Sequence, residues 1–355
     1  SVRLIDAAGH YMDIATNDIT VSKGEIKAMP PVEFVPAGTL VGVEIASAAD
    51  LVAFAKAYNA GEYAELDNLN VQVTSDIVFD DETNAEWANI GCIGGTQWFA
   101  GAFDGKEHTI RNWVTSRPLF YGTEANARVE NMNIDASCTL TAPYLEDQYY
   151  GALVGYHTGL LSNCHNFASV AVSGKWATPA NVGGLVGRVA ANGKIDQCSM
   201  SGDVTADATF EVSGTVYLGG IAGCIAAAGG QISYSHFSGS LASSGRSLET
   251  VNENNAVTAG INYVGGITGL VGGTVENCYT AASQSVSAEY ETAYVQTMFL
   301  GGIAGSVKSD GILADSHNNA SVSFSSPKPT TSATAYVGGV AGALGGANNN
   351  TKAVS

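Results

Sequence analysis

The glycine-rich stretch from Tyr263 to Thr280, YVGGITGLVGGTVENCYT, holds residue types that could cradle a phosphate or present a reactive thiol. A P-loop requires G-x-x-x-x-G-K-[ST] between a strand and a helix. The nearest approach, GRVAANGKI from Gly187, has Ile195 in place of the Ser or Thr that would ligate magnesium. No helical pattern follows these glycines, so neither a nucleotide site nor any other cofactor is expected.

Six cysteines could form disulfides or a metal site in a secreted protein. Cys164, Cys198 and Cys278 occupy one equivalent position in repeated segments, where two other copies have Ser235 and Ser316. Side chains stacked in parallel point the same way rather than at each other, which predicts free buried thiols. No C-x-x-C pair or matching histidine pair exists, so we expect no metal site.

The six histidines invite a catalytic interpretation, but three of them are periodic. His165, His236 and His317 each follow the Cys or Ser of a repeated segment. This pattern is typical of residues on the face of a coil rather than of a general base. The acidic segment FDDETNAEW lacks the ligand spacing of an EF-hand and is interpreted as an ordinary acidic loop.

Glycan contact would need exposed aromatic rings beside polar groups. Tyr144, in the segment YLEDQYY, and Trp176, in an expected loop, are the candidate ligand-binding residues. Tyr150, Tyr217 and Tyr263 belong to glycine-rich segments and are interpreted as structural.

Composition places the chain among folded proteins. Of 355 residues, 45% are hydrophobic and 14% are charged, which is too apolar for a disordered chain. The formal net charge of -18 repels nucleic-acid phosphates, so nucleic acid is not an expected partner. No apolar run approaches the roughly 18 residues of a transmembrane helix, so no membrane span is expected.

The elements that position these residues are repeats. Six glycine boxes recur at intervals of about 32 to 46 residues, a period typical of solenoids and propellers. They are YYGALVG from Tyr149, NVGGLVG from Asn181, YLGGIAG from Tyr217, YVGGITG from Tyr263, FLGGIAG from Phe299 and YVGGVAG from Tyr336.

Each box is followed by a strand-like segment, as in IDQCSMSGDVTAD. Short strands cannot bury an apolar face alone, so stacking of units predicts an all-β parallel β-helix, a solenoid. Its glycines would allow positive φ at corners and a close approach of neighbouring coils. A propeller is the alternative, although it would need four regular strands per unit.

The region before the repeats differs in pattern. SAADLVAFAKAYNAG, from Ser47 to Gly61, has a capping box and one apolar stripe, which predicts a helix that could cover the open end of the solenoid. We therefore expect three parts: a short β-rich N-terminal segment (1–42), an N-terminal cap helix with the first coils (43–148), and the repeat β-helix (149–355).

The paired boxes GGLVGRVAANGKIDQCSMSGDV and GGITGLVGGTVENCYTAASQSV resemble the GLUG repeat of bacterial cell-surface proteins. Upstream, IASAADLVAFAKAYNAG, VTSDIVF, EWANIG and FAGAFDGKEHTI are similar to the helical cap and first coils that precede such repeats in Bacteroides-type surface proteins. The resemblance covers roughly residues 43–355. In FDGKEHTI, Lys106 and Glu107 replace the family's Asn and Gly, so we expect a looser or differently shaped turn there.

This resemblance implies a right-handed parallel β-helix and an extracellular or cell-surface location, associated with the outer membrane. It implies an adhesive or glycan-contacting role and no catalytic residues. The expected partner is a host or bacterial glycan or a surface protein.

Three functional classes follow. The leading hypothesis is a non-catalytic, adhesin-like or glycan-contacting β-helix; a polysaccharide-active lyase or hydrolase and a passive spacer are the alternatives. An enzyme of this kind needs carboxylates that converge from neighbouring coils. Asp196, Glu276 and Asp315 lie at related offsets, but the sequence shows no repeated Asp or Glu column.

The sixth box is followed by ALGGANNNTKAVS, in which no cap is recognisable. An uncovered last coil is an aggregation hazard. We therefore expect further sequence or a partner to cover that end.

Overall fold

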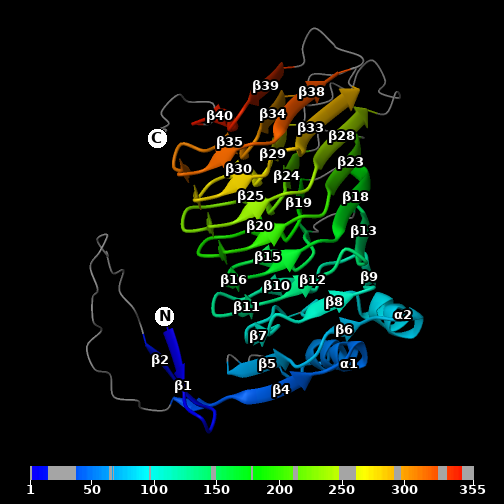
Figure 1. Ribbon diagram of the computed structural model, residues 1–355, viewed down its shortest axis with the longest axis vertical. Coiled ribbons are helices and arrows are strands. Elements are labelled where there is room, and N and C mark those ends of the chain that lie inside the picture. The colour runs from blue at the N-terminus through cyan, green and yellow to red at the C-terminus, as the bar shows by residue number, and fades with distance from the viewer. Residues whose placement is uncertain are drawn as a thin grey trace, which may run out of the picture.

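The computed structural model describes residues 2–14, 37–63, 66, 68–95, 97–144, 149–176, 179–210, 215–247, 261–291, 297–326 and 334–345. The chain winds into a stack of coils that runs from α1 (Ala48–Asn59) and α2 (Asp81–Ile90) to β40 (Ala341–Leu344) (Figure 1). Strands of successive coils pair in parallel. The expected all-β parallel β-helix is confirmed.

A complete coil contributes one strand to each of five sheets, which we number I to V in the order the chain visits them. Sheet I contains β10 (Phe120–Thr123), β15 (Val154–His157), β20 (Val186–Val189), β25 (Ala222–Ile225), β30 (Thr268–Val271), β35 (Ala304–Val307) and β40. Sheet II contains β4 (Val41–Ile45), β5 (Leu69–Val73), β7 (Ala102–Asp104), β11 (Arg128–Glu130), β16 (Leu160–Ser162), β21 (Lys194–Asp196), β26 (Gln231–Ser233), β31 (Thr274–Glu276) and β36 (Ile312–Ala314).

The other three sheets complete the coil. Sheet III contains β6 (Ile77–Val78), β8 (Thr109–Arg111), β12 (Asn133–Ile134), β17 (His165–Asn166), β22 (Ser199–Met200), β27 (His236–Phe237), β32 (Tyr279–Thr280) and β37 (His317–Asn318). Sheet IV contains β9 (Val114–Thr115), β13 (Thr139–Pro143), β18 (Ser169–Trp176), β23 (Val204–Phe210), β28 (Leu241–Ser247), β33 (Ser285–Glu291) and β38 (Ser321–Ser325). Sheet V contains β14 (Tyr149–Tyr150), β19 (Ala180–Gly183), β24 (Val216–Gly219), β29 (Ile261–Gly265), β34 (Thr297–Gly301) and β39 (Thr334–Gly338).

The core consists of columns of apolar side chains that keep their register from coil to coil. In sheet V, Val182, Leu218, Val264 and Leu300 are successive partners and are fully buried. Burying one such side chain completely stabilises the fold by about 1.5–3 kcal/mol. Because these columns touch one another, the core is one cluster that continues through the stack.

The glycine boxes mark the corner where sheet V passes into sheet I. A Cβ on Gly219 would collide with the carbonyl oxygen of Ala222 and with the Cα of Thr268 in the next coil. The expected close approach of coils is therefore confirmed. The expected positive φ is wrong for the box glycines, because the glycines with positive φ, such as Gly61 and Gly229, lie outside the boxes.

Left-handed backbone occurs instead at the corner between sheets II and III, and residues other than glycine adopt it. They have φ between 45° and 55° and are Asn131, Asn163, Gln197, Tyr234, Asn277 and Asp315. Asn tolerates this region better than most residues. Asn163 Nδ2 donates to Asn131 Oδ1 at 2.8 Å, so neighbouring corners are also linked by their side chains.

The FDGKEHTI turn has two consecutive left-handed residues, Lys106 (φ 49°) and Glu107 (φ 64°). The Lys106 amide and ammonium group both donate to Asp104, at 2.9 and 2.8 Å. The Glu107 amide donates to the carbonyl of Asn131 in the next coil at 2.9 Å. The turn is therefore held by hydrogen bonds and is not loose, although it places two side chains in a strained region.

The predicted cap helix is confirmed as α1. Ser47 accepts a hydrogen bond from the Asp50 amide at 3.2 Å, which caps the first turn. Phe54 and Tyr58 are buried on the face that meets the first coils, and the Tyr58 ring lies 5.6 Å from that of Phe99. The helix lies across the N-terminal end of the stack (Figure 1).

The segment interpreted as an acidic loop is the start of α2, which corrects the expectation. The Asp80 carboxylate accepts from the Thr83 amide at 2.8 Å, and Thr83 Oγ1 accepts from the Asp80 amide at 2.9 Å. Asp81 and Glu82 follow in the first turn, where the helix dipole favours negative charge. Trp87 anchors the helix through edge contact with Trp113 at 5.6 Å.

The two ends of the chain differ from the coils between them. β1 (Val2–Ile5), β2 (His10–Ile14) and β3 (Gly38–Thr39) form a small antiparallel sheet, and pairing with the solenoid begins at β4. In the last described coil, Val337 is 48% exposed although its partner Leu300 is fully buried. The expectation that something covers this coil stays a prediction, as do the expected boundaries after residues 42 and 148.

Candidate functional site

The two candidate ligand-binding residues lie near sheet IV. Tyr144 follows β13 and is 8% exposed, with its ring 6.4 Å from that of Tyr150. The expected loop at Trp176 is wrong, because Trp176 is the last residue of β18 and pairs with Phe210 through the backbone; its side chain lies outside the described part of the chain. Little of the Tyr144 ring is available for stacking, and the ligand role of this pair stays a prediction.

A larger aromatic feature runs along the outer face of sheet V. Tyr217, Tyr263, Phe299 and Tyr336 are successive register partners, one from each of four coils. Their rings are nearly parallel, at interplanar angles of 5°, 15° and 12°, with centroids 5.1, 5.2 and 5.1 Å apart. The stack becomes more exposed toward the last described coil, where Tyr336 is 47% exposed.

Aromatic residues of the earlier coils form a second cluster, which Asn181 separates from this stack in the sheet V column. The Tyr156 ring lies 4.8 Å from Trp98 and 5.1 Å from Tyr149, which occupies the sheet V column two coils before Tyr217. The Arg188 guanidinium lies 5.8 Å from the Tyr156 centroid. We name Trp98, Tyr149, Tyr156, Arg188, Tyr217, Tyr263, Phe299 and Tyr336 the aromatic strip.

Backbone geometry explains why these side chains meet. Gly122, Tyr156 and Arg188 are register partners in sheet I, and a Cβ on Gly122 would occupy the Trp98 ring. The ring of Trp98 therefore lies across a glycine of the neighbouring strand. Tyr58 fixes it further by donating to the Trp98 carbonyl at 2.9 Å.

The strip offers groups for binding rather than for catalysis. Stacking hides most ring faces, so the strip presents ring edges and hydroxyl groups at the coil repeat of about 4.8 Å. Burial raises the pKa of Tyr217 to about 12, so its hydroxyl stays neutral and can both donate and accept. Arg188 has no ion-pair partner among the described residues, and its Nε is buried with no hydrogen-bond partner there.

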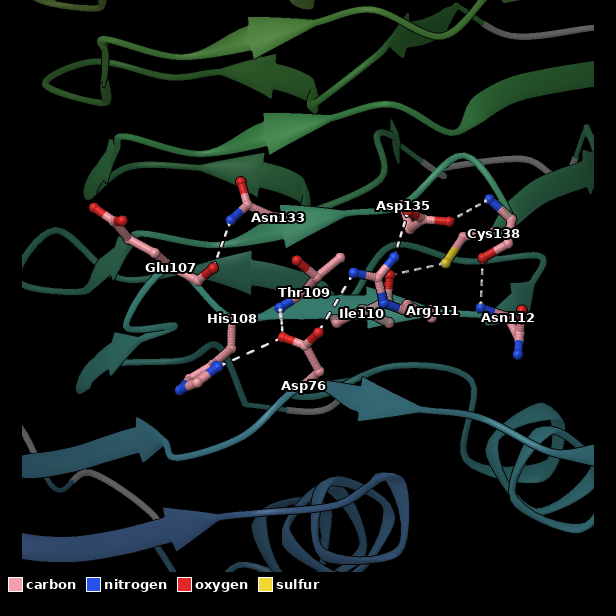
Figure 2. A network of polar contacts seen from close by, with 11 residues as sticks. Asp76, Glu107, His108, Thr109, Ile110, Arg111, Asn112, Asn133, Asp135 and Cys138 are labelled. Carbon is pink, nitrogen blue, oxygen red and sulfur yellow. Dashed lines mark hydrogen bonds and ion pairs between the residues drawn. The ribbon is translucent and has the colours of Figure 1, made fainter.

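The first coils contain a polar network that resembles part of a catalytic site. Figure 2 shows Asp76 between His108 and Arg111: its carboxylate lies 3.5 Å from His108 Nδ1 and 3.4 Å from Arg111 Nη2. The Thr109 amide donates to Asp76 at 3.0 Å, and this bond contributes most to the lowered pKa of the Asp76 carboxyl.

Arg111 also donates to Asp135 at 2.7 Å, so the network ties successive coils together (Figure 2). A carboxylate that orients a histidine needs a nucleophile on the other side of the imidazole. Among the described residues no hydroxyl or thiol is hydrogen-bonded to His108, and Asp76 is its ion-pair partner. We interpret the network as structural.

A carboxylate column exists, which corrects the reading that none is repeated. On the outer face of sheet II the successive partners are Asp104, Glu130, Ser162, Asp196, Ser233 and Glu276. Serines alternate with carboxylates after Glu130, so not every coil contributes a carboxylate to the column. Asp315 lies outside it, at the corner between sheets II and III.

The column's carboxylates are already occupied by neighbouring side chains. Arg128 Nη2 donates to Glu130 at 2.8 Å, and Ser162 donates to the same carboxylate at 3.0 Å. For Asp104, burial alone would raise the pKa, but hydrogen bonds from Asn131 and Lys106 outweigh it and the pKa is lowered. A general acid needs a raised pKa, so Asp104 does not have the electrostatics of the acid in a glycoside-cleaving pair.

The periodic histidines share one outer column of sheet III, which confirms their interpretation as residues of a coil face. His165, Ser199, His236, Tyr279 and His317 are successive partners. The Tyr279 ring stacks on His236 at 4.9 Å and on His317 at 5.4 Å.

The six cysteines are free and buried, as expected. Cys164, Cys198 and Cys278 each donate to the carbonyl two residues earlier, at 3.2 Å. Ser235 makes the same bond at 2.8 Å. Burial raises the pKa of the Cys278 thiol to about 12, so it is not a thiolate nucleophile at neutral pH.

Metal-binding clusters and membrane-spanning helices are both absent from the described ranges. No group of three or more His, Cys, Asp and Glu side chains there is arranged to hold a metal ion. Neither described helix has the length and hydropathy needed to cross a bilayer.

Comparisons with known proteins agree with the repeat. Residues 178–205 match the GLUG motif, so the chain carries this motif as its sequence indicated. A similar solved structure is that of a candidate immunoglobulin A1 protease from Bacteroides ovatus, with 17% identity, 84% coverage of each chain and a TM-score of 0.49. A likeness at this level carries no argument about activity. No curated protein sequence matches the chain.

Proposed function

We propose that this chain is a non-catalytic β-helix of a secreted or cell-surface protein and that it binds an extended glycan along the aromatic strip. The observation that carries the proposal is the strip itself: a cluster of three rings, the Arg188 cation with no ion-pair partner among the described residues, and a stack of four rings follow one another over successive coils. A passive spacer would use the same ring stack only for stability, so ligand binding separates the two functions.

The chemistry of the strip fits a hydroxyl-rich ligand. Tyrosine hydroxyls along the strip can exchange hydrogen bonds with sugar hydroxyls. Tyr336 is 47% exposed, so its ring can pack against the C–H face of a sugar. The repeat of the strip follows the coil axis, so it suits an elongated chain better than a compact ligand.

The enzymatic alternative has weaker support. The sheet II carboxylates are engaged by Arg128, Asn131 and serine hydroxyls, and the Asp104 pKa is lowered rather than raised. The GLUG motif and the resemblance of the cap region favour a surface location, with a host or bacterial glycan or surface protein as the partner.

A glycan array on the intact chain, followed by calorimetry with the strongest ligand, tests the proposal. Tyr336→Ala and Arg188→Gln should each weaken binding by about tenfold, the loss of one aromatic or charged contact. Tyr234→Asn is the matched control, because Tyr234 is 62% exposed away from the strip and Asn occupies the same corner in Asn163 and Asn277.

Binding to no glycan, or an equal loss in Tyr234→Asn, would overturn the proposal. A Tyr144→Ala/Trp176→Ala double variant serves as a further arm. If this variant loses binding while the strip variants keep it, the site lies at the edge of sheet IV instead.

A further inference from the structure

A separate cavity of about 310 Å³ lies between the N-terminal hairpin and the solenoid. One wall is Arg3 and Asp13 of the hairpin, and the other is the outer face of sheet II with the turns that lead into it from sheet I. The volume is at the lower end of the range for small-molecule sites. The cavity shares no lining residue with the aromatic strip.

Cations gather in this cavity although the chain as a whole is strongly acidic. Its lining includes Arg3, Arg128 and Lys194, against a single carboxylate, Asp13. Arg128 and Lys194 stand in one column of sheet II with Leu160 between them. Three positive groups around one hollow repel one another unless negative charge offsets them.

Two of the three cations are already held in place. Arg3 forms a two-pronged pair with Asp13 at 2.7 and 2.8 Å, and its guanidinium lies 4.2 Å from the Tyr11 ring. Arg128 forms a similar pair with Glu130 at 3.1 and 2.8 Å. Fixed side chains lose little freedom on binding, which favours a preorganised site.

Lys194 is different, because its ammonium group has no ion-pair partner among the described residues. Among the described side chains that line the cavity, Arg3 and Arg128 are each paired with a carboxylate, so the Lys194 ammonium is the cation left without such a partner. A ligand with one negative charge would neutralise the Lys194 ammonium. A phosphate dianion would leave an excess of negative charge in the cavity.

The rest of the lining favours an organic anion over an inorganic one. Leu160, Ala102 and Ala127 provide an apolar floor between the cations, and Asn126 and Asn192 provide amide groups at the turns. An inorganic ion would leave the apolar floor unused. A carbon skeleton with hydroxyl groups would use both.

We propose that this cavity binds a small monoanionic, hydroxyl-bearing carboxylate, such as a sugar acid, with Lys194 as its principal counter-charge. The carboxylate is shared by free sugar acids and by acidic residues at the end of a glycan. Because Arg3 comes from the hairpin and Lys194 from the solenoid, the bound ligand would bridge the two.

Calorimetric titration of the full chain tests this assignment, with glucuronate as the probe and glucose as the uncharged control of the same ring. We expect one glucuronate per chain, no binding of glucose, and weaker glucuronate binding as sodium chloride rises. Lys194→Gln should weaken binding by about tenfold or more, whereas Lys194→Arg should retain most of it.

Lys56→Gln is the matched control, since it removes one positive charge at a distant ion pair with Glu86. Equal loss in Lys56→Gln, absence of glucuronate binding, or tighter binding of sulfate or phosphate would overturn the proposal. Hydrogen exchange gives an independent readout, because glucuronate should slow exchange in residues 2–14 of the parent and not of Lys194→Gln. A free sugar acid is the ligand if glucuronate suffices; tighter binding of an oligosaccharide that ends in glucuronate indicates a glycan terminus.

Discussion

His157 makes the stability of the solenoid depend on pH in a way that can be calculated. Its imidazole is fully buried, between Thr123 Oγ1 at 2.9 Å and the Lys194 carbonyl at 3.0 Å. Burial lowers the pKa of His157 to about 4, and the hydrogen bond to Lys194 only partly opposes it. The native protein therefore keeps this histidine neutral at pH values where an unfolded chain protonates it.

The sign and size of the effect follow from linkage. The unfolded state binds a proton near pH 6.5 and the folded state near pH 4, so stability is retained above pH 6.5 and lost as the pH falls between these values. Lowering the pH from 7 to 4.5 should reduce the free energy of unfolding by about 2.5 kcal/mol through this group alone.

Urea unfolding at pH 7, 5.5 and 4.5, followed by circular dichroism, measures the loss. His157→Val is the reference, because Val189 is the register partner of His157 in the next coil and the side chain fits an apolar column. Carboxylates and the other histidines titrate in both proteins and cancel in the comparison. Equal pH dependence of parent and variant would refute the reasoning, whatever the stability of the variant at pH 7.

Other contacts give smaller, local expectations. The free energy of unfolding of Cys278→Ser should stay within about 1 kcal/mol of the parent, because Ser235 and Ser316 already donate a hydrogen bond from the equivalent position. Cys278→Ala should lose about 1–2 kcal/mol more in urea unfolding. Equal losses in the two variants would contradict the hydrogen-bond role. Glu107→Gly should stabilise the chain by about 0.5–1 kcal/mol, because the strain energy removed at a left-handed residue exceeds the entropy cost of ordering a glycine. The control Glu289→Gly, in β33, should destabilise the chain. Tyr263→Ala, which removes two ring stacks, should lower the free energy of unfolding by about 3 kcal/mol, and Tyr234→Ala by less than about 0.5 kcal/mol; similar losses would argue against the stack. Light scattering should show self-association through the exposed apolar side chains of the last described coil as concentration rises, and a strict monomer would count against it.

The sequence predicts the repeat and the cap helix well because both depend on local pattern. Ser47 and the apolar spacing of Leu51, Phe54 and Tyr58 are enough to predict α1. α2 was missed because its cap is Asp80 with Thr83, which lacks the glutamate or glutamine of the usual capping box.

The candidate site is harder to predict because it depends on which columns meet. Tyr217 and Tyr263 belong to recognisable boxes, but nothing in their spacing indicates that Trp98 and Tyr156 lie in the same strip. That contact depends on how sheets V and I fold against each other across glycines such as Gly219. The only available signal was an aromatic residue at the start of most boxes, and it is equally expected of a purely structural stack.

In-register pairing between coils affects how a repeat chain of this kind can evolve. Leu218 and Val264 are partners in adjacent coils, so deletion of 219–264 would join two equivalent points and remove one whole turn of the solenoid. Duplication of the same segment would add one. Because each coil meets only its two neighbours, either event leaves every remaining column intact. Recombination can therefore lengthen or shorten the solenoid by whole coils while the fold stays the same.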